Sequence, residues 1–357
     1  MGAYYRVGGS RRRRKNGFGL FVLIAFFIIF LSVALTTYVV FFRPNTYTAA
    51  LPVAELTIPT GSDFDKVSEI IYGKGLVINR TTFKWASFWL QYHKKVRPGY
   101  YLVYPDMSNL ELIRILRSGR QTPVKVTFNS LRDVYQLSER IAGQIEADSA
   151  SIAGLLSDSA YISFLGYDIY TIPALFIPNT YEFYWTTSAE GFISRMFEEH
   201  KRFWNESRRT KAAQIPLSPL EVSILASIVE KETNKNDEKP IIAGVYINRL
   251  RYGWRLQADP TLVFATRDFE ARRIADFHLN FNSPYNTYMY AGLPPGPICI
   301  PSISSIDAVL NFQKHRFFYF CARDDLSGYH AFAENYEQHQ FNAWKYRRAL
   351  DRLNIRR

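Results

Sequence analysis

The sequence predicts an α+β protein with an N-terminal transmembrane helix, a small α+β module, and a larger mixed α/β domain with long loops. A run of 25 uncharged residues, 18–42, predicts the transmembrane helix. Short strand patterns and helical patterns alternate over residues 56–120, and they predict the small module. A strong helix start near residue 218 precedes segments rich in Pro, Gly, Asn and Tyr, and together they predict the larger domain.

The membrane segment also predicts the orientation of the chain. Twenty or so apolar helical residues cross a bilayer, and no small-residue cleavage site follows the run, so it is interpreted as a retained anchor rather than a signal peptide or a buried core helix. Six of the positive charges lie before residue 17, next to the span. The positive-inside rule then predicts that residues 1–17 form a cytoplasmic tail and that the body lies outside the cytoplasm. Topology therefore explains the arginine run better than nucleic-acid binding does, and no nucleic-acid partner is predicted.

Length, charge and composition limit the classes of protein to which the chain can belong. The chain has 357 residues, enough for two or three domains, and a net charge of +12. Cys299 and Cys321 fit neither a disulfide framework nor a zinc pattern, and they are interpreted as small core residues. A single bridge between them stays open, because the body is predicted to lie in an oxidising compartment. The six histidines show no metal-binding spacing, so no metal and no cofactor is predicted.

The body divides into four predicted parts. A short extended tether is predicted at 43–55, a small module at 56–123, a connecting α+β region at 124–215, and the functional region at 216–357. In the module, strands are predicted at 56–58 and 98–103, and helices at 63–71, 81–93 and 109–117. A strand at 124–128 and a helix at 134–145 are predicted next. They resemble the beginning of the module and suggest a weak internal repeat. Residues 150–215 are predicted to be helical around an interrupting loop at 177–183.

One helix carries the strongest candidate for chemistry. Ser218 and Glu221 form a capping box, with Pro219 at the first helical position, and predict a helix through residue 232. Glu230 is aligned with the small residues Ser223, Ala226 and Ser227, whereas Leu225, Ile228 and Val229 form an apolar stripe. A carboxyl group on a narrow small-residue face can meet a bulky ligand, and partial burial would raise its pKa, as a general acid requires. Glu232 is predicted to point elsewhere. A solvated surface charge is the alternative interpretation of Glu230.

Five segments in order resemble the endolytic murein transglycosylase family, also called MltG or YceG-like. They are LASIVEKET at 225–233, VYINRL at 245–250, RLQADPT at 255–261, SPYNTY at 283–288 and GLPPGPI at 292–298. Together their order and spacing are a specific signal over about residues 50–350. The resemblance implies that Glu230 is the catalytic residue and that the module at 56–123 is LysM-like. It also implies a bacterial inner-membrane protein whose substrate is peptidoglycan and whose candidate protein partners are peptidoglycan synthases.

The resemblance implies a mechanism with one carboxyl group. Glu230 would protonate the oxygen between N-acetylmuramic acid and N-acetylglucosamine, and would then accept the proton of the muramic acid C6 hydroxyl, which closes onto C1 as a 1,6-anhydro end. Such cuts inside nascent strands would terminate their elongation. Residues predicted to bind the substrate lie in the loops at 254–262 and 283–300: Gln257, Asp259, Asn286 and Tyr288 as hydrogen-bonding groups and Tyr285 as a sugar-stacking ring. These loops are equally compatible with structural turns.

Two alternative functions stay open, and one residue departs from the family motif. A muramidase that uses water would need a second carboxylate, for which Asp259 and Glu182 are the candidates. A catalytically silent peptidoglycan-binding scaffold is the rival from another class, and the complete glutamate motif argues against it. Asn179 stands in the segment PNTY, where many members of the family have an aspartate, so any role of that acid in relatives is in doubt here.

Overall fold

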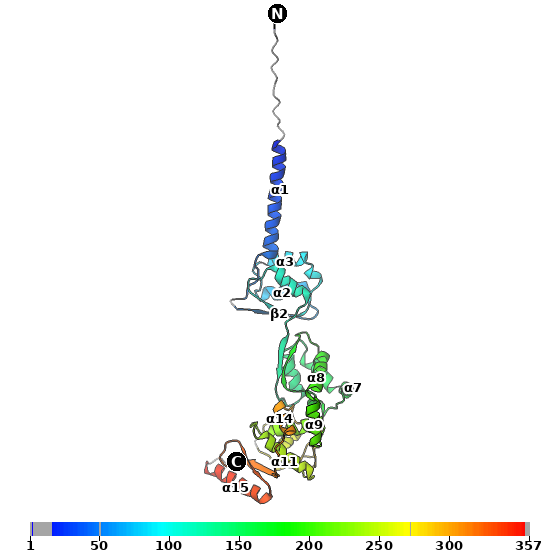
Figure 1. Ribbon diagram of the computed structural model, residues 1–357, viewed down its shortest axis with the longest axis vertical. Coiled ribbons are helices and arrows are strands. Elements are labelled where there is room, and N and C mark those ends of the chain that lie inside the picture. The colour runs from blue at the N-terminus through cyan, green and yellow to red at the C-terminus, as the bar shows by residue number, and fades with distance from the viewer. Residues whose placement is uncertain (1, 3–15, 50, 272, 354–357) are drawn as a thin grey trace. The chain divides into compact units, whose positions relative to one another are not determined.

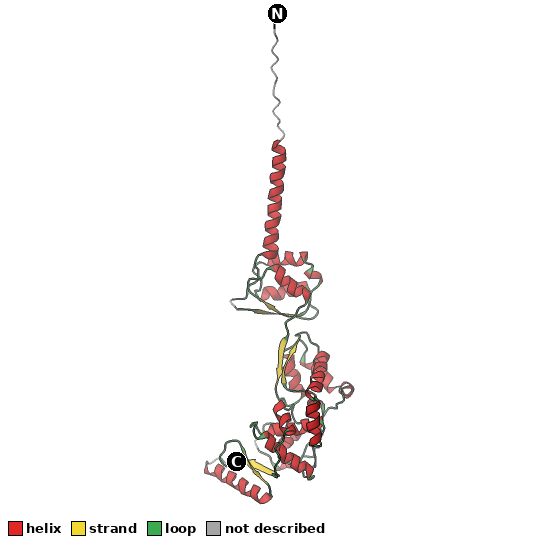
Figure 2. Cartoon of the chain, viewed as in Figure 1, coloured by secondary structure: helices red, strands yellow, loops and turns green. Residues whose placement is uncertain are grey.

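The computed structural model describes residues 2, 16–49, 51–271 and 273–353, and the chain forms two compact units, Met1–Pro123 and Val124–Arg357 (Figures 1 and 2). Each unit combines helices with small antiparallel sheets, as the predicted α+β class requires. The predicted cytoplasmic tail, including its basic cluster, lies almost wholly outside the described residues. Unit 1 has one hydrophobic core, and unit 2 has two.

The first unit begins with the apolar helix. Helix α1 covers Asn16–Thr37 and continues into a π-helical turn, η1, at Tyr38–Phe42. The 25 residues from Phe18 to Phe42 are long and apolar enough to cross a bilayer, and the protein itself buries none of their most apolar window. A helix that is apolar on all sides and packs against nothing needs an apolar solvent around it.

The rest of unit 1 has the strand, helix, helix, strand, helix order that the sequence predicted. Its elements are β1 (Ala54–Ile58), α2 (Phe64–Gly73), α3 (Arg80–Trp89), η2 (Tyr92–Lys94), β2 (Gly99–Val103) and α4 (Asn109–Ser118). The two strands pair antiparallel in full register. Helix α4 begins at a capping box made by Ser108 and Glu111 and ends before Gly119, whose φ of 71° is the left-handed conformation that glycine favours. The helix predicted at 81–93 breaks after Trp89, where Gln91 adopts a left-handed conformation.

The prediction of an extended tether at 43–55 is wrong for its first half. Asn45, Thr46 and Thr48 are almost completely buried. The Asn45 side-chain amide donates hydrogen bonds to Asn109 Oδ1 and to the Asn79 carbonyl, and the Thr46 hydroxyl donates to the Tyr104 carbonyl. Side-chain polar groups thus fix the segment onto the module. The sequence pattern did not show this, because short polar stretches bind through partners that are distant in the chain.

Unit 2 opens with a second sheet that the sequence analysis missed. Strand β3 (Val124–Phe128) pairs antiparallel with β4 (Asn179–Phe183), which lies where a loop was predicted. Between and after them lie α5 (Val134–Ala142), α6 (Ser149–Ser157), α7 (Ser159–Phe164), η3 (Ile172–Leu175), α8 (Ala189–Phe203) and α9 (Glu206–Gln214). The partner of β4 lies about 55 residues earlier, and local pattern cannot reveal such a pairing. The strand, helix, helix, strand order of unit 1 therefore recurs here with one added short helix.

The remainder of unit 2 is more helical than the predicted long loops. It contains α10 (Pro219–Glu232), α11 (Lys239–Arg251), α12 (Asp259–Thr266), α13 (Asp276–Leu279), α14 (Ile303–Leu310), β5 (Tyr319–Ala322), β6 (His330–Ala333) and α15 (Tyr336–Arg352). The predicted capping box and N1 proline of α10 are confirmed. Every residue from Val222 to Val229 is buried, so α10 is a central core helix rather than one with a single apolar stripe.

Candidate active site

Two glutamates end helix α10, and their side chains enter different surroundings. Glu230 and Glu232 both lie in the last turn, and Thr233 is the C-cap. Residues two apart on a helix do not share a face. The structure therefore gives two separate carboxyl environments, and Glu232, but not Glu230, lines the cavity described below.

Glu230 is held by donors from α11 and α14. Its Oε2 accepts hydrogen bonds from the hydroxyls of Ser302 and Ser305, and Lys239 Nζ lies 3.2 Å away. The side chains of Lys239 and Glu230 are 5% and 16% exposed. Ser302 is the N-cap of α14, so the carboxylate lies at the positive end of that helix. Glu230 thus joins the ends of three helices in the core of unit 2.

The predicted raised pKa of Glu230 is wrong. Burial, the largest influence, would raise the pKa of Glu230, but the hydrogen bonds from Ser302 and Ser305 and the charge of Lys239 outweigh it and leave the pKa below its ordinary value. Hydrogen bonds to the charged form favour ionisation. At neutral pH this carboxyl group is therefore an anion whose Oε2 already accepts hydrogen bonds from three donors, which does not suit a general acid.

The small side chains beside Glu230 contact the protein rather than a ligand. The Ser227 hydroxyl accepts a hydrogen bond from the Ile298 backbone N–H at 2.9 Å, and both Ser227 and Ala226 are fully buried. The segment that packs here contains Gly296, where an added Cβ would lie 2.0 Å from the Tyr170 carbonyl oxygen. The small-residue face is explained by this close approach of the chain, and the proline-rich segment acts as a structural turn.

Glu232 occupies a more apolar environment. Its Oε1 accepts a hydrogen bond from the Tyr246 hydroxyl on α11. Burial raises the pKa of Glu232 to about 7, the nearby charge of Asp259 adds to the rise, and Tyr246 and Arg249 partly oppose it. A carboxyl group that keeps its proton close to neutral pH can donate it to a substrate. Glu232 therefore has the protonation behaviour that the sequence analysis assigned to Glu230.

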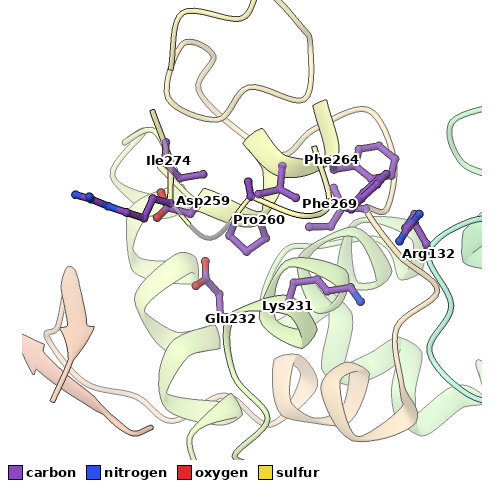
Figure 3. Close-up of a pocket in the computed structure, with 12 residues that line it drawn as sticks. Arg132, Lys231, Glu232, Asp259, Pro260, Phe264, Phe269 and Ile274 are labelled. Carbon is purple, nitrogen blue, oxygen red and sulfur yellow. The ribbon is translucent and has the colours of Figure 1, made fainter. Parts of the chain in front are cut away.

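Glu232 lines a cavity of about 460 Å³ in unit 2. Its carboxyl group points toward Asp259 and Pro260 across the cavity, and Lys231 from the same helix also lines it (Figure 3). The rings of Phe264 and Phe269 contribute apolar surface to the same cavity. A concave site that combines apolar walls with a few polar groups, one of them with a shifted pKa, is the usual form of a catalytic pocket.

Asp259 and Tyr288 are the predicted substrate-binding residues that the structure brings together. The Tyr288 hydroxyl donates a hydrogen bond to Asp259 Oδ1 at 2.6 Å. The Thr287 hydroxyl accepts a hydrogen bond from the Ala258 backbone N–H at 3.0 Å, and it is 2.9 Å from the Thr261 hydroxyl. These bonds fix the start of α12 against the loop at 283–290. Asp259 faces the cavity with Glu232, so this part of the prediction defines one wall of the site.

The other predicted substrate-binding residues lie elsewhere. Tyr285 is 8% exposed and its ring packs against Phe264, so it is a core residue rather than a sugar-stacking surface. Asn286 is fully buried, and its amide donates to the carbonyls of Leu279 and Phe281. Gln257 is outside the residues that line the cavity, and its backbone N–H donates to the Thr287 carbonyl. All three help to hold the loops in place.

Strand β4 places two further candidates away from the cavity. Glu182 is exposed and lies opposite Lys125 in the sheet, so the rival pair of Glu182 with a helix glutamate has no structural support. Asn179 is exposed at the start of β4, and its side-chain oxygen accepts a hydrogen bond from the Thr180 backbone N–H. Neither residue lines the cavity.

A buried glutamate that hydrogen-bonds to the C-terminal hairpin fixes the chain that follows Glu232. Glu238 is 3% exposed. It accepts hydrogen bonds from the His330 backbone N–H at 2.7 Å and from the Thr233 hydroxyl at 3.3 Å, and it lies 2.9 Å from His330 Nδ1. His330 belongs to β6, so the C-terminal hairpin holds the end of α10. The sequence analysis missed this pair, because its members are more than 90 residues apart.

Cysteines and metal ligands take no part in the site as described. Cys299 and Cys321 are free thiols, and burial raises the pKa of Cys299 to about 11. The bridge that the sequence left open is therefore not formed. Within residues 16–49, 51–271 and 273–353, no three His, Cys, Asp or Glu side chains converge in a way that could hold a metal ion.

Comparison with known proteins finds relatives that carry the same protein name. Proteins named endolytic murein transglycosylase from Streptococcus pneumoniae serotype 2 and Bacillus subtilis are 27% and 25% identical to it, over 80% and 82% of this chain. The matched part spans 57% of the Streptococcus protein, little more than half its length, and 84% of the Bacillus protein. The crystal structure of a putative yceG-like protein from Listeria monocytogenes matches 81% of this chain and 98% of its own, with a TM-score of 0.55 at 27% identity. The model of the YceG-like family matches residues 56–345, and the chain therefore belongs to this family.

Proposed function

We propose that this protein is a membrane-anchored endolytic murein transglycosylase, which cleaves the bond between N-acetylmuramic acid and N-acetylglucosamine inside peptidoglycan strands. Membership of the YceG-like family and the names of two relatives support the activity. The observation that carries the proposal is Glu232, a carboxyl group with a pKa of about 7 on the wall of a cavity large enough for sugar rings. A single acid of this kind is sufficient when the substrate supplies the nucleophile.

Glu232, rather than Glu230, is the acid and base in this proposal. Three observations favour it: it lines the cavity, its pKa is raised, and only Tyr246 among the described residues hydrogen-bonds to its carboxyl oxygens. Glu230 is an anion fixed by Lys239 and two serine hydroxyls. The role of Glu230 is then to hold α10, α11 and α14 together behind the site.

The proposed reaction needs no water. The Glu232 carboxyl group donates its proton to the glycosidic oxygen, and the C1–O bond breaks with its electron pair going to that oxygen. The resulting carboxylate accepts the proton of the C6 hydroxyl of the same muramic acid, while O6 forms a bond to C1. The products are a free N-acetylglucosamine hydroxyl and a 1,6-anhydro end. Because Glu232 regains its proton, the enzyme returns to its starting state.

The position of Asp259 is the observation that favours the alternative function, a muramidase that uses water. Asp259 lines the same cavity as Glu232, and a pair of carboxyl groups can activate water as well as protonate the leaving group. In the transglycosylase proposal, Asp259 and its partner Tyr288 instead bind sugar hydroxyls and stabilise positive charge that develops at C1.

The test between these two functions uses the full-length protein, purified glycan strands and water enriched in ¹⁸O. A transglycosylase leaves muramic acid ends that lack one water and carry no ¹⁸O, whereas a muramidase leaves reducing ends with one ¹⁸O at C1. We expect fragments of internal cleavage with unlabelled anhydro ends by mass spectrometry after short incubation. Labelled reducing ends as the initial product would overturn the proposed reaction.

The pH dependence gives a second test, through Tyr246. Glu232 must be protonated to act as an acid, so kcat/KM is expected to fall as the pH rises through about 7. The hydrogen bond from Tyr246 lowers the pKa of Glu232, so Tyr246→Phe should move this basic limb to higher pH. Tyr252→Phe, at a residue that is 70% exposed, is the matched control and should leave the limb in place. A limb that stays unchanged in Tyr246→Phe would contradict the role of Glu232.

Anchoring and orientation complete the proposal. The basic residues before α1 favour an N-terminus in the cytoplasm and a body on the outer side of the bacterial inner membrane. Because residues 44–48 pack onto the first unit, that unit is held directly at the membrane, where new glycan strands emerge. We propose that the module at 56–123 binds or orients the strand as a LysM-like domain does, that residues 216–357 carry the chemistry, and that synthases are the partners whose products are cut.

A further inference from the structure

Helix α3 exposes an aromatic face that the proposed chemistry does not use. Trp89, Trp85 and Phe88 are 77%, 56% and 45% exposed. They lie at helical spacing on one face, while Phe83 and Ala86 on the other face are fully buried in the core of unit 1. Large aromatic side chains gathered on one exposed helix face mark an interaction surface.

This face lies beside the end of the membrane helix. Helix α3 and α4 both pack against η1, the last turn of the apolar segment. Val40 in η1 is 6% exposed and belongs to the same core as Phe83 and Ala86, and Asn109 Nδ2 donates a hydrogen bond to the Val40 carbonyl at 2.8 Å. The module is therefore fixed to the end of the span, and α3 is seen at the foot of α1 in Figure 1.

The length of α1 gives the depth of α3 relative to the bilayer. Helix α1 has 22 residues, and at about 1.5 Å per residue it extends roughly 33 Å. The hydrocarbon core is about 30 Å thick, so η1 begins where the hydrocarbon ends. Tyr38 and Phe42 in η1 are 55% and 54% exposed, which suits the headgroup region. Since α3 packs on η1, it lies at this same depth.

The charges around α3 match an anionic membrane surface. No Asp or Glu occurs between Glu69 and Asp106. The same stretch contains six basic residues, Lys74, Arg80, Lys84, Lys94, Lys95 and Arg97, of which Arg80 and Lys84 belong to α3 and are exposed. Exposed aromatic rings and exposed basic residues on the same helix are typical of helices that lie in the interface of anionic bilayers.

We propose that the aromatic face of α3 docks into the headgroup region of the bilayer that α1 spans, with the surrounding basic residues bound to anionic phospholipids. Insertion of Trp85 and Trp89 supplies apolar burial, and the cations supply attraction to lipid phosphates. A single helix is free to tilt and rotate, so this second contact fixes the orientation of unit 1 on the membrane. Glycan is the competing occupant, because aromatic rings also stack on sugars, and the test below includes it.

The test measures the depth of a label at position 89 in the full-length protein. Trp89→Cys and a control, Glu69→Cys, are each made with Cys321→Ser, labelled with an environment-sensitive fluorophore, and reconstituted in vesicles that contain phosphatidylglycerol. Glu69 is an exposed residue of α2, which packs on β1. Spin-labelled lipids with the quencher near the headgroup should quench the label at position 89 several-fold more strongly than at position 69, and its emission should shift to the blue. Equal, weak quenching at the two positions would overturn the proposal.

Two further measurements separate the membrane from the glycan. Lys84→Glu should reduce the quenching at position 89 in vesicles with phosphatidylglycerol, whereas Lys66→Glu on α2 should leave it unchanged. Oligomers of N-acetylglucosamine should not alter the emission of the label. An emission change with the sugar and none with lipid would assign the face to glycan instead and reject membrane docking.

Discussion

Glu232→Gln is expected to lower kcat by about 10²–10⁴-fold, the usual contribution of a positioned general acid. Glutamine keeps the shape of the side chain and can still accept the hydrogen bond from Tyr246, but it has no proton to donate. The measurement is single-turnover cleavage of glycan strands by the full-length protein. The control is thermal unfolding, since an inactive protein that has also unfolded would reveal nothing about the acid.

The same substitution should improve stability at alkaline pH. The native state keeps the Glu232 proton up to about pH 7, whereas the unfolded chain releases it near the ordinary value of 4.5. The native state thus binds more protons across this window, so the wild-type protein loses stability as the pH rises through it. Glu232→Gln removes that loss, and its melting temperature should exceed that of the wild type at pH 8 but not at pH 4. An unfolding profile parallel to the wild type would contradict the raised pKa.

Glu230→Gln is expected to destabilise the protein by about 3–5 kcal/mol, the usual cost of breaking a buried ion pair from one side. The charge of Lys239, whose side chain is 5% exposed, would be left without its partner. Because the pKa of Glu230 is lowered, its stabilising effect is present above the ordinary pKa and is lost as the pH falls through the lower folded value. Denaturant unfolding at pH 7 measures the change.

The double variant Glu230→Gln, Lys239→Met provides the matched control for this prediction. Removing both charges leaves no unpaired buried ion, so the double variant should be more stable than Glu230→Gln alone. The difference in stability between the wild type and Glu230→Gln should become small below the folded pKa of Glu230, where the wild-type carboxyl group is protonated. If Glu230→Gln unfolds like the wild type at pH 7, the structural role of Glu230 is excluded.

The sequence predicts the helix that carries both candidate glutamates, whereas our proposal of Glu232 over Glu230 depends on contacts that are distant in the chain. Ser218 and Glu221 predicted α10 correctly, because capping is a local interaction. The prediction of Glu230 rested on the resemblance to the family motif and on its small neighbours, and those neighbours pack against the Ile298 segment. In our proposal the useful signal is the apolar stripe: Glu232 follows Ile228 and Val229 by four and three residues, and an acid on that side becomes desolvated. The donors on Ser302 and Ser305, some 70 residues later, were beyond any local pattern.

The difference between local and distant interactions also explains which parts of the fold the sequence predicted. The strands and helices of unit 1 follow from alternation, helical spacing and caps within a few residues, and the predicted order is confirmed. Strand β4 and the folded segment at 44–48 depend on partners about 30 to 65 residues away, such as β3 for the former and Asn79, Tyr104 and Asn109 for the latter. Pairing of this kind is decided by tertiary packing, so local sequence reasoning assigned both segments to loops.

The most direct measurement compares Glu230→Gln and Glu232→Gln for the rate at which they form anhydro ends, at a temperature where unfolding data show both to be native. The cavity is lined by Glu232 and not by Glu230, so we expect the first variant to keep cleaving strands and the second to form anhydro ends about 10²–10⁴-fold more slowly than the wild type. If instead Glu232→Gln cleaves at the rate of the wild type while folded Glu230→Gln is inactive, the proton is donated from the other carboxyl group and the assignment of the site is wrong.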